Sequence, residues 1–162
     1  MKKYILITFL VYSSVFSYSQ IDTIKNQRIF SIGINAGMTT GTGLSFRYMP
    51  NKFGVQFSAI PIISIPINSP QSKVQKSGTL SFTVLRQLKS AKKIDFNFYE
   101  AQTLLFDDDI TVSVGAGSLA DIKLGYDMSL SINIGLAFIT GDFLDDNWLL
   151  LPDFGFGFYY KF

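Results

Sequence analysis

The last eleven residues of the chain, 152–162, alternate between two kinds of side chain. Aromatic rings occupy every second position, namely Phe154, Phe156, Phe158, Tyr160 and Phe162. In a β-strand all of these rings point to one face, because successive side chains point to opposite faces. The other face carries Gly155, Gly157, Tyr159 and Lys161. A face rich in glycine suits a cramped interior, so the pattern predicts a strand whose bulky apolar face lies outside.

The same alternation recurs along most of the chain, as where Phe30, Ile32 and Ile34 alternate with small or polar residues. It predicts eight strands, at about 28–38, 42–49, 53–63, 79–88, 93–103, 110–127, 131–140 and 152–162. Lipid offers no hydrogen-bond partners, so only a closed ladder satisfies such backbones in a membrane. We therefore predict an all-β fold, an eight-stranded antiparallel up-and-down transmembrane β-barrel. The alternative is a soluble secreted β-sandwich or lipocalin-like barrel.

The predicted turns and loops divide between the two ends of this barrel. Turn chemistry marks 50–52, and the lysines at 89–93 and the segment 127–131 mark two further turns at the same end. An even number of strands places these turns, and both termini of the chain, on the periplasmic side. The loops near Thr40, Ser69, Asp108 and Asp145 are then expected to face outward.

The amino terminus has the pattern of a secretory signal peptide. Lys2 and Lys3 precede an apolar run, and a small-x-small site follows at 17–19. The apolar run is shorter than the ~20 residues that a spanning helix needs. We expect a signal peptide at 1–19 and a barrel domain at 20–162. Removing Lys2 and Lys3 from the 14 basic residues leaves 12, equal to the 12 acidic residues, so no charge excess favours nucleic acid.

The chain contains neither cysteine nor histidine. The absence of cysteine excludes a lipid-modified amino terminus, disulfides and thiolate metal sites. Enzymes with outer-membrane barrel folds generally rely on a histidine as base or proton relay. We therefore expect no enzymatic activity and no cofactor.

Several polar residues have the parity that points into the barrel. They are Arg47, Gln56, Asp95, Asn97, Lys123, Asp127 and Lys161. Charges in so small an interior must pair, so we expect a polar network that fills the lumen. The alternative is a selectivity filter in a narrow channel.

The segment 60–77 is apolar yet contains three prolines. The residues expected to dock a partner are Ile62, Ile63, Ile65, Pro66 and Ile67. Proline stiffness lowers the entropy lost on binding, which suits docking against another protein. The alternative is a loop that folds over the rim of its own barrel.

Two acidic stretches lie between predicted strands. They contain Asp107, Asp108, Asp109, Asp145 and Asp146. Carboxylates can hold Ca²⁺ or Mg²⁺, but these stretches lack the spaced ligands and glycine of a Ca²⁺ loop. We expect a solvated acidic rim and no metal site.

Taken together, the signal peptide, the hairpin rhythm and the terminal aromatic strand resemble the small outer-membrane β-barrel proteins of the porin-like and OmpX- or OmpA-barrel-like kind. The resemblance implies the outer membrane of a Gram-negative bacterium, with contacts to outer-membrane lipid and lipopolysaccharide. It also implies that the barrel assembly machinery reads the terminal aromatic strand. The expected role is a structural or accessory subunit, with another outer-membrane protein as its partner. A narrow channel for ions or small solutes, or a surface adhesin, is the alternative role.

Overall fold

The computed structural model describes residues 29–64, 75–106, 110–140 and 149–162 of the chain. The predicted signal peptide lies outside these residues. The described strands are β1 (Phe30–Gly37), β2 (Gly43–Tyr48), β3 (Phe53–Ser64), β4 (Gln75–Ser90), β5 (Ile94–Phe106), β6 (Ile110–Lys123), β7 (Met128–Thr140) and β8 (Leu149–Lys161). No described segment is a helix long and apolar enough to cross a membrane.

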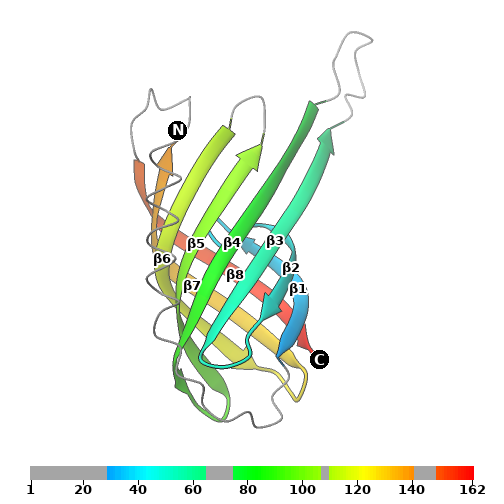
Figure 1. The fold of residues 1–162 in the computed structure, drawn as a ribbon, viewed down its shortest axis with the longest axis vertical. Helices are drawn as coiled ribbons and strands as arrows, with labels where there is room; N and C mark the ends of the chain where they lie inside the picture. The colour runs from blue at the N-terminus through cyan, green and yellow to red at the C-terminus, as the bar shows by residue number, and fades with distance from the viewer. Residues whose placement is uncertain (1–28, 65–74, 107–109, 141–148) are drawn as a thin grey trace.

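The eight strands form one closed barrel in which every strand pairs antiparallel with its neighbours in the chain. β8 closes the barrel by pairing with β1, from Ser31 opposite Lys161 to Gly37 opposite Gly155. The predicted eight-stranded antiparallel up-and-down barrel is therefore confirmed. Figure 1 shows the strands inclined around a long axis, with the start of β1 and the end of β8 at the same end. We call this end, which also carries the turns 49–52, 91–93 and 124–127, the terminal rim.

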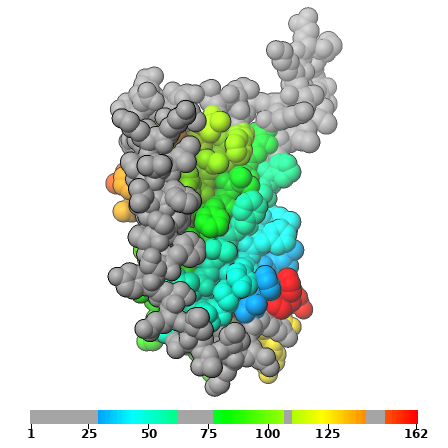
Figure 2. Space-filling view, viewed as in Figure 1, coloured from blue at the N-terminus to red at the C-terminus, as the bar shows by residue number. Residues whose placement is uncertain are grey.

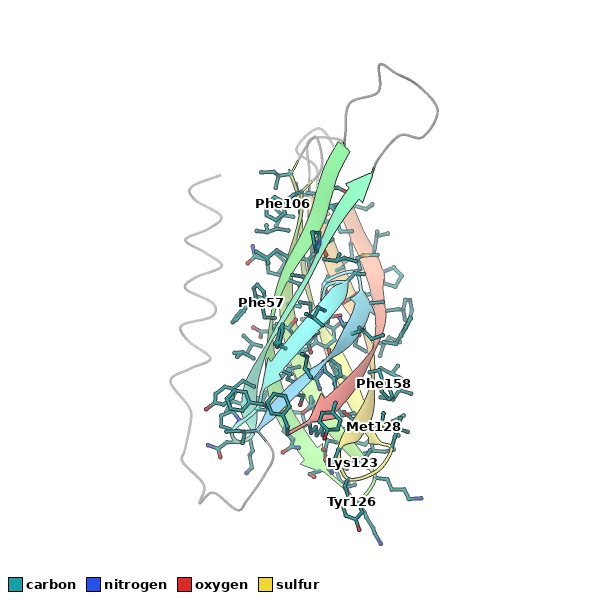
Figure 3. All side chains as sticks on the ribbon, turned by 90° about the vertical axis from the view of Figure 1, so that its right-hand side faces the viewer. Phe57, Phe106, Lys123, Tyr126, Met128 and Phe158 are labelled. Atoms are coloured by element: carbon teal, nitrogen blue, oxygen red, sulfur yellow. The ribbon has the colours of Figure 1, made fainter. Side chains whose placement is uncertain are left out.

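The two faces of the wall have opposite chemistry. Most of the large apolar side chains are on the outside, and Figure 3 shows Phe57, Phe106 and Phe158 projecting away from the barrel. Among the described residues, nineteen polar or charged residues are buried but only seven apolar ones. A water-soluble barrel has the reverse arrangement, with apolar residues inside. Figure 2 shows side chains of β3 and β4 packed side by side on this outer surface.

Glycines on the inner face make room for two buried tyrosines. A Cβ added at Gly135 would lie 2.5 Å from the hydroxyl of Tyr99 and 2.3 Å from the backbone oxygen of Ala116. Added at Gly33, it would lie 2.8 Å from the ring of Tyr159. Both tyrosines are fully buried, so the glycine-rich face seen in the sequence accommodates large rings from other strands.

Several strand boundaries differ from the prediction. β6 runs unbroken through Gly117 to Lys123, and the turn that follows is 124–127 rather than 127–131. β4 is longer than expected and contains a bulge between Gln87 and Lys89. β5 extends to Phe106 and β8 begins at Leu149, beyond the predicted 93–103 and 152–162. β3 continues through Pro61 to Ser64, close to the predicted 53–63. Proline is tolerated at Pro61 because the pairing of β3 with β2 ends at Ala59. Beyond Ala59, β3 pairs with β4 alone.

The loop between β1 and β2, residues 38–42, folds into the barrel, and we call it the inner loop. The loop lies at the end of the barrel opposite the terminal rim, as predicted, but it turns into the lumen instead of projecting outward, since Thr39 and Thr40 are 0% and 1% exposed. β1 and β2 are the two shortest strands, which brings their connection down among the polar groups inside the wall. Gly41 permits the turn with a φ of 82°, and a Cβ there would lie 2.3 Å from that of Ser81.

We expect Gly135→Ala to destabilise the barrel because its methyl group must displace backbone oxygen and the Tyr99 hydroxyl. Such overpacking costs about 1–3 kcal/mol in the free energy of unfolding. Gly125→Ala is the matched control, since a Cβ at Gly125 meets nothing within 4 Å. Denaturant unfolding of the refolded protein measures both. Equal stability of the two variants would contradict the packing argument.

Candidate functional site

A buried ion pair spans the barrel interior. Arg47 on β2 places Nη1 2.8 Å from Oδ1 and 2.9 Å from Oδ2 of Asp121 on β6. The two side chains are only 4% and 5% exposed. Two charges removed from water are stable only when they are paired and their remaining hydrogen-bonding groups find partners.

Strands β3, β7 and β8 supply those partners to the guanidinium of Arg47. Its Nε and Nη2 donate to Oε1 of Gln56 at 3.1 and 2.8 Å. Its Nη2 also donates to Oγ of Ser131 at 3.3 Å. The guanidinium carbon lies 4.1 Å from the centre of the Tyr159 ring, a distance at which a cation is attracted to the ring.

The carboxylate of Asp121 is equally well supported. Asn97 donates its amide nitrogen to Oδ2 at 3.0 Å, and Ser131 donates its hydroxyl to Oδ1. These interactions join six strands in what we call the polar layer: Arg47, Gln56, Asn97, Asp121, Ser131 and Tyr159. The polar layer crosses the lumen.

The alternation in the sequence predicts only part of the polar layer. Arg47, Gln56 and Asn97 were among the residues expected to point inward, and the structure brings them together. Asp121 was missed although it is two residues from Lys123 and shares its parity. That parity was the available signal.

A second ion pair lies nearer the terminal rim. Nζ of Lys123 is 2.8 Å from Oδ1 of Asp95 and donates to the carbonyl of Ala91 at 3.1 Å. Lys123 is 30% exposed, so water screens this pair more than the Arg47–Asp121 pair. Asp127, expected in the network, lies in the turn 124–127, where its backbone carbonyl accepts the N–H of Lys161 at 2.6 Å.

The inner loop fills the barrel on the other side of the polar layer. The hydroxyl of Thr39 donates to Asp153 on β8, which also accepts from the hydroxyl of Tyr99 at 2.6 Å. The carbonyl of Thr39 accepts from Ser81 at 3.1 Å and from Thr103 at 2.6 Å. Asp153 was missed by the sequence analysis, although it has the same parity as Gly155 and Lys161.

Hydroxyl groups connect the inner loop with the polar layer. Oγ of Ser58 donates to Oγ of Ser45 at 2.9 Å, and Ser45 lies 3.2 Å from the hydroxyl of Tyr159. The side-chain nitrogen of Gln56 lies 3.5 Å from the carbonyl of Thr40. The described interior is therefore occupied by side chains and by the inner loop through much of its length.

A cavity of about 410 Å³ remains between the polar layer and the terminal rim, and we call it the terminal cup. Arg47, Asp95, Asn97, Asp121, Lys123 and Lys161 contribute to its lining. Residues of the rim turns, such as Asn51 and Tyr126, also line it, and Tyr126 is fully exposed. The terminal cup therefore opens at the terminal rim.

The terminal aromatic residues all lie on the outside. Phe154, Phe156, Phe158, Tyr160 and Phe162 are exposed. At the terminal rim the ring of Phe30 stacks on that of Phe162, with centroids 6.1 Å apart, and packs against Tyr48 at 4.9 Å. An aromatic cluster thus lies where β1 and β8 close the barrel.

The predicted docking segment is divided by the structure. Ile62 and Ile63 belong to β3, where they pair with Ser77 and Lys76 on β4. Ile65, Pro66 and Ile67 lie outside the described residues. β3 and β4 therefore form a longer hairpin than the sequence analysis expected.

The acidic stretches also lie beyond the part of the chain that the structure describes. They contain Asp107, Asp108, Asp109, Asp145 and Asp146. Within the described ranges, no group of three or more acidic residues is arranged to hold a metal ion.

No protein-family model, curated protein or solved structure matches this chain.

We expect Arg47→Met to cost about 3–5 kcal/mol in the free energy of unfolding, because it leaves the carboxylate of Asp121 buried without its cation. Lys123→Met removes the half-exposed pair and should cost at most about 1 kcal/mol. Denaturant unfolding measures both variants. Adding Asp121→Leu to Arg47→Met should restore part of the loss, and a further loss of the same size would argue against direct coupling.

Proposed function

We propose that this chain is a non-enzymatic integral β-barrel of the outer membrane of a Gram-negative bacterium. Its role is that of a structural or accessory subunit of an outer-membrane assembly. The observation that carries the proposal is the inverted wall, with apolar side chains outside and polar or charged side chains buried.

The inverted wall favours a lipid environment over water. Ile34 and Phe156 are 65% and 64% exposed, and they are part of an apolar surface that extends over all eight strands. Exposing apolar surface to water costs roughly 25 cal/mol per Å², and soluble monomers rarely expose contiguous patches above a few hundred Å². In hydrocarbon this cost is absent, and ladder closure provides backbone hydrogen bonds along the wall.

The two ends of the barrel suggest an orientation. Connections at the terminal rim are three short turns, which is typical of the periplasmic end of such barrels. Tyr48 and Tyr160 are exposed near this rim, and aromatic residues of this kind sit at the headgroup level of membranes. We therefore assign the terminal rim to the periplasm and the opposite end to lipopolysaccharide and the exterior.

The filled interior favours a role at the surfaces over a channel. The polar layer and the inner loop occupy the lumen, and an eight-stranded barrel leaves an interior only wide enough for side chains. The remaining surfaces are the lipid-facing wall, the turns and the far end. A second outer-membrane protein is the expected partner there, and the barrel assembly machinery reads the aromatic strand β8 during insertion.

The membrane environment is tested by adding a charge to the outer wall. Ile134 lies mid-way along β7 and is 58% exposed. Ile134→Arg should lower the free energy of unfolding from bilayers by about 2–4 kcal/mol, because arginine is costly at the bilayer midplane. Tyr126→Arg is the control, since Tyr126 lies in a rim turn.

Refolding into lipid vesicles measures both of these variants. A soluble barrel would tolerate both arginines equally well, since both positions are exposed. That result, or recovery of the parent protein from the periplasm without detergent, would refute membrane insertion.

The subunit role predicts that the barrel is extracted from outer membranes with a partner. Mild detergent extraction followed by native mass measurement should yield a species heavier than the 18.1 kDa full chain. A clean monomer under every mild condition, with unaltered envelope complexes in a deletion strain, would contradict this role while leaving membrane insertion intact.

A further inference from the structure

Among the side chains that the structure describes, every charged one that is exposed is a cation. These cations are Lys52, Arg86, Lys89, Lys92 and Lys93. Lys52 directly precedes β3, Arg86 and Lys89 are on β4, and the other two lie in the turn between β4 and β5. Because β3, β4 and β5 lie side by side in the barrel (Figure 1), the five cations form one continuous stretch of the terminal rim, which we call the cationic arc.

The described carboxylates do not neutralise the cationic arc. Asp95 and Asp121 are buried in the lumen, where each of them pairs with a cation there. Asp127 lies in the separate turn 124–127 between β6 and β7. On the outer face of β4 and β5 the described carboxylate is Glu100, which is half-buried. Five exposed cations against this one carboxylate give the β3–β5 side of the terminal rim a positive potential.

The cationic arc borders the apolar outer wall. Lys89 pairs across the sheet with Phe96, which is 45% exposed, and the adjacent Leu88 is 62% exposed. Arg86 pairs with Phe53, and its guanidinium carbon lies 5.5 Å from the centre of that ring. Long basic side chains cover apolar surface with their methylene groups and extend their charge toward water. In the bilayer of the proposed function, the arc is at the level of the lipid headgroups.

The rest of the terminal rim has a different composition. Its exposed residues include Tyr48, Tyr126, Tyr160 and Phe162, and no described cation outside the arc is exposed there. Aromatic residues favour the interface of any bilayer, whereas a set of cations distinguishes anionic from uncharged headgroups. Selection of a lipid by charge is therefore expected on the β3–β5 side.

We propose that the cationic arc binds anionic phospholipids of the periplasmic leaflet through their headgroup phosphates. The guanidinium of Arg86 can donate two N–H groups to one phosphate. Lys89 supplies a second cation on the same outer face, since the two residues pair with the exposed Phe98 and Phe96. The lysines of the two turns add to the attraction toward an anionic membrane surface. This proposal rests on the proposed membrane insertion and orientation but not on the subunit role.

Native mass measurement of the full chain released from lipid nanodiscs tests the proposal. The nanodiscs contain equal parts of phosphatidylglycerol, which is anionic, and phosphatidylcholine, which has a phosphate but no net charge. Barrels that retain phosphatidylglycerol should outnumber those that retain phosphatidylcholine at least roughly fivefold, since one basic residue near an anionic surface contributes about that factor. Equal retention of the two lipids by the inserted barrel would overturn the lipid site alone. A chain that does not enter nanodiscs would refute membrane insertion, and the lipid site with it.

Variants locate the lipid on the terminal rim. Arg86→Gln should lower the preference for phosphatidylglycerol roughly fivefold, and Lys89→Gln is a second variant with the same expected direction. Lys123→Gln is the matched control, because it also removes one positive charge near this rim but from a side chain that faces the lumen and pairs with Asp95. It should leave the preference unchanged. An equal loss in Arg86→Gln and Lys123→Gln would show that net charge alone selects the lipid, which would overturn a site on the arc.

Discussion

Closure of the hydrogen-bonded ladder between β1 and β8 is the constraint on which the other features depend. Once Ser31 pairs with Lys161 and Gly37 with Gly155, the sheet has an inside and an outside. Period-two alternation then sends every second side chain into a space that only small residues and a few large ones can share. The inward glycines provide the volume that the rings of the buried Tyr99 and Tyr159 occupy.

The interior is organised by electrostatics more than by apolar packing. Arg47 and Asp121 are buried with opposite charges, and the surrounding donors and acceptors form hydrogen bonds with them. Hydroxyl groups extend this network to the inner loop, whose backbone carbonyl at Thr39 accepts from two different strands. The filled half of the barrel is consequently held in place by hydrogen bonds that cross the lumen.

This division of the interior has a functional consequence. The far half is occupied by the inner loop, whereas the half next to the terminal rim contains the open terminal cup. The apolar outer wall favours a lipid environment for the barrel. The filled lumen favours the proposed role at the surfaces of the barrel over a channel. The terminal cup is an open part of the described interior, and its lining is rich in charged groups.

The sequence by itself determined the strand number and the two faces, because side-chain alternation is a local property of each strand. It could not locate the turn 124–127, since the apolar parity of β6 continues unchanged into β7 and alternation carries no sign of a turn there. It selected Arg47 as inward but not its partner, because Asp121 is 74 positions away and the pairing depends on the register of the strands around the barrel. Nor could it show that the inner loop turns inward, since Thr39 is held by groups on β4, β5 and β8. Only the closed tertiary structure decides these features, because it alone brings strands distant in sequence to face one another across the lumen.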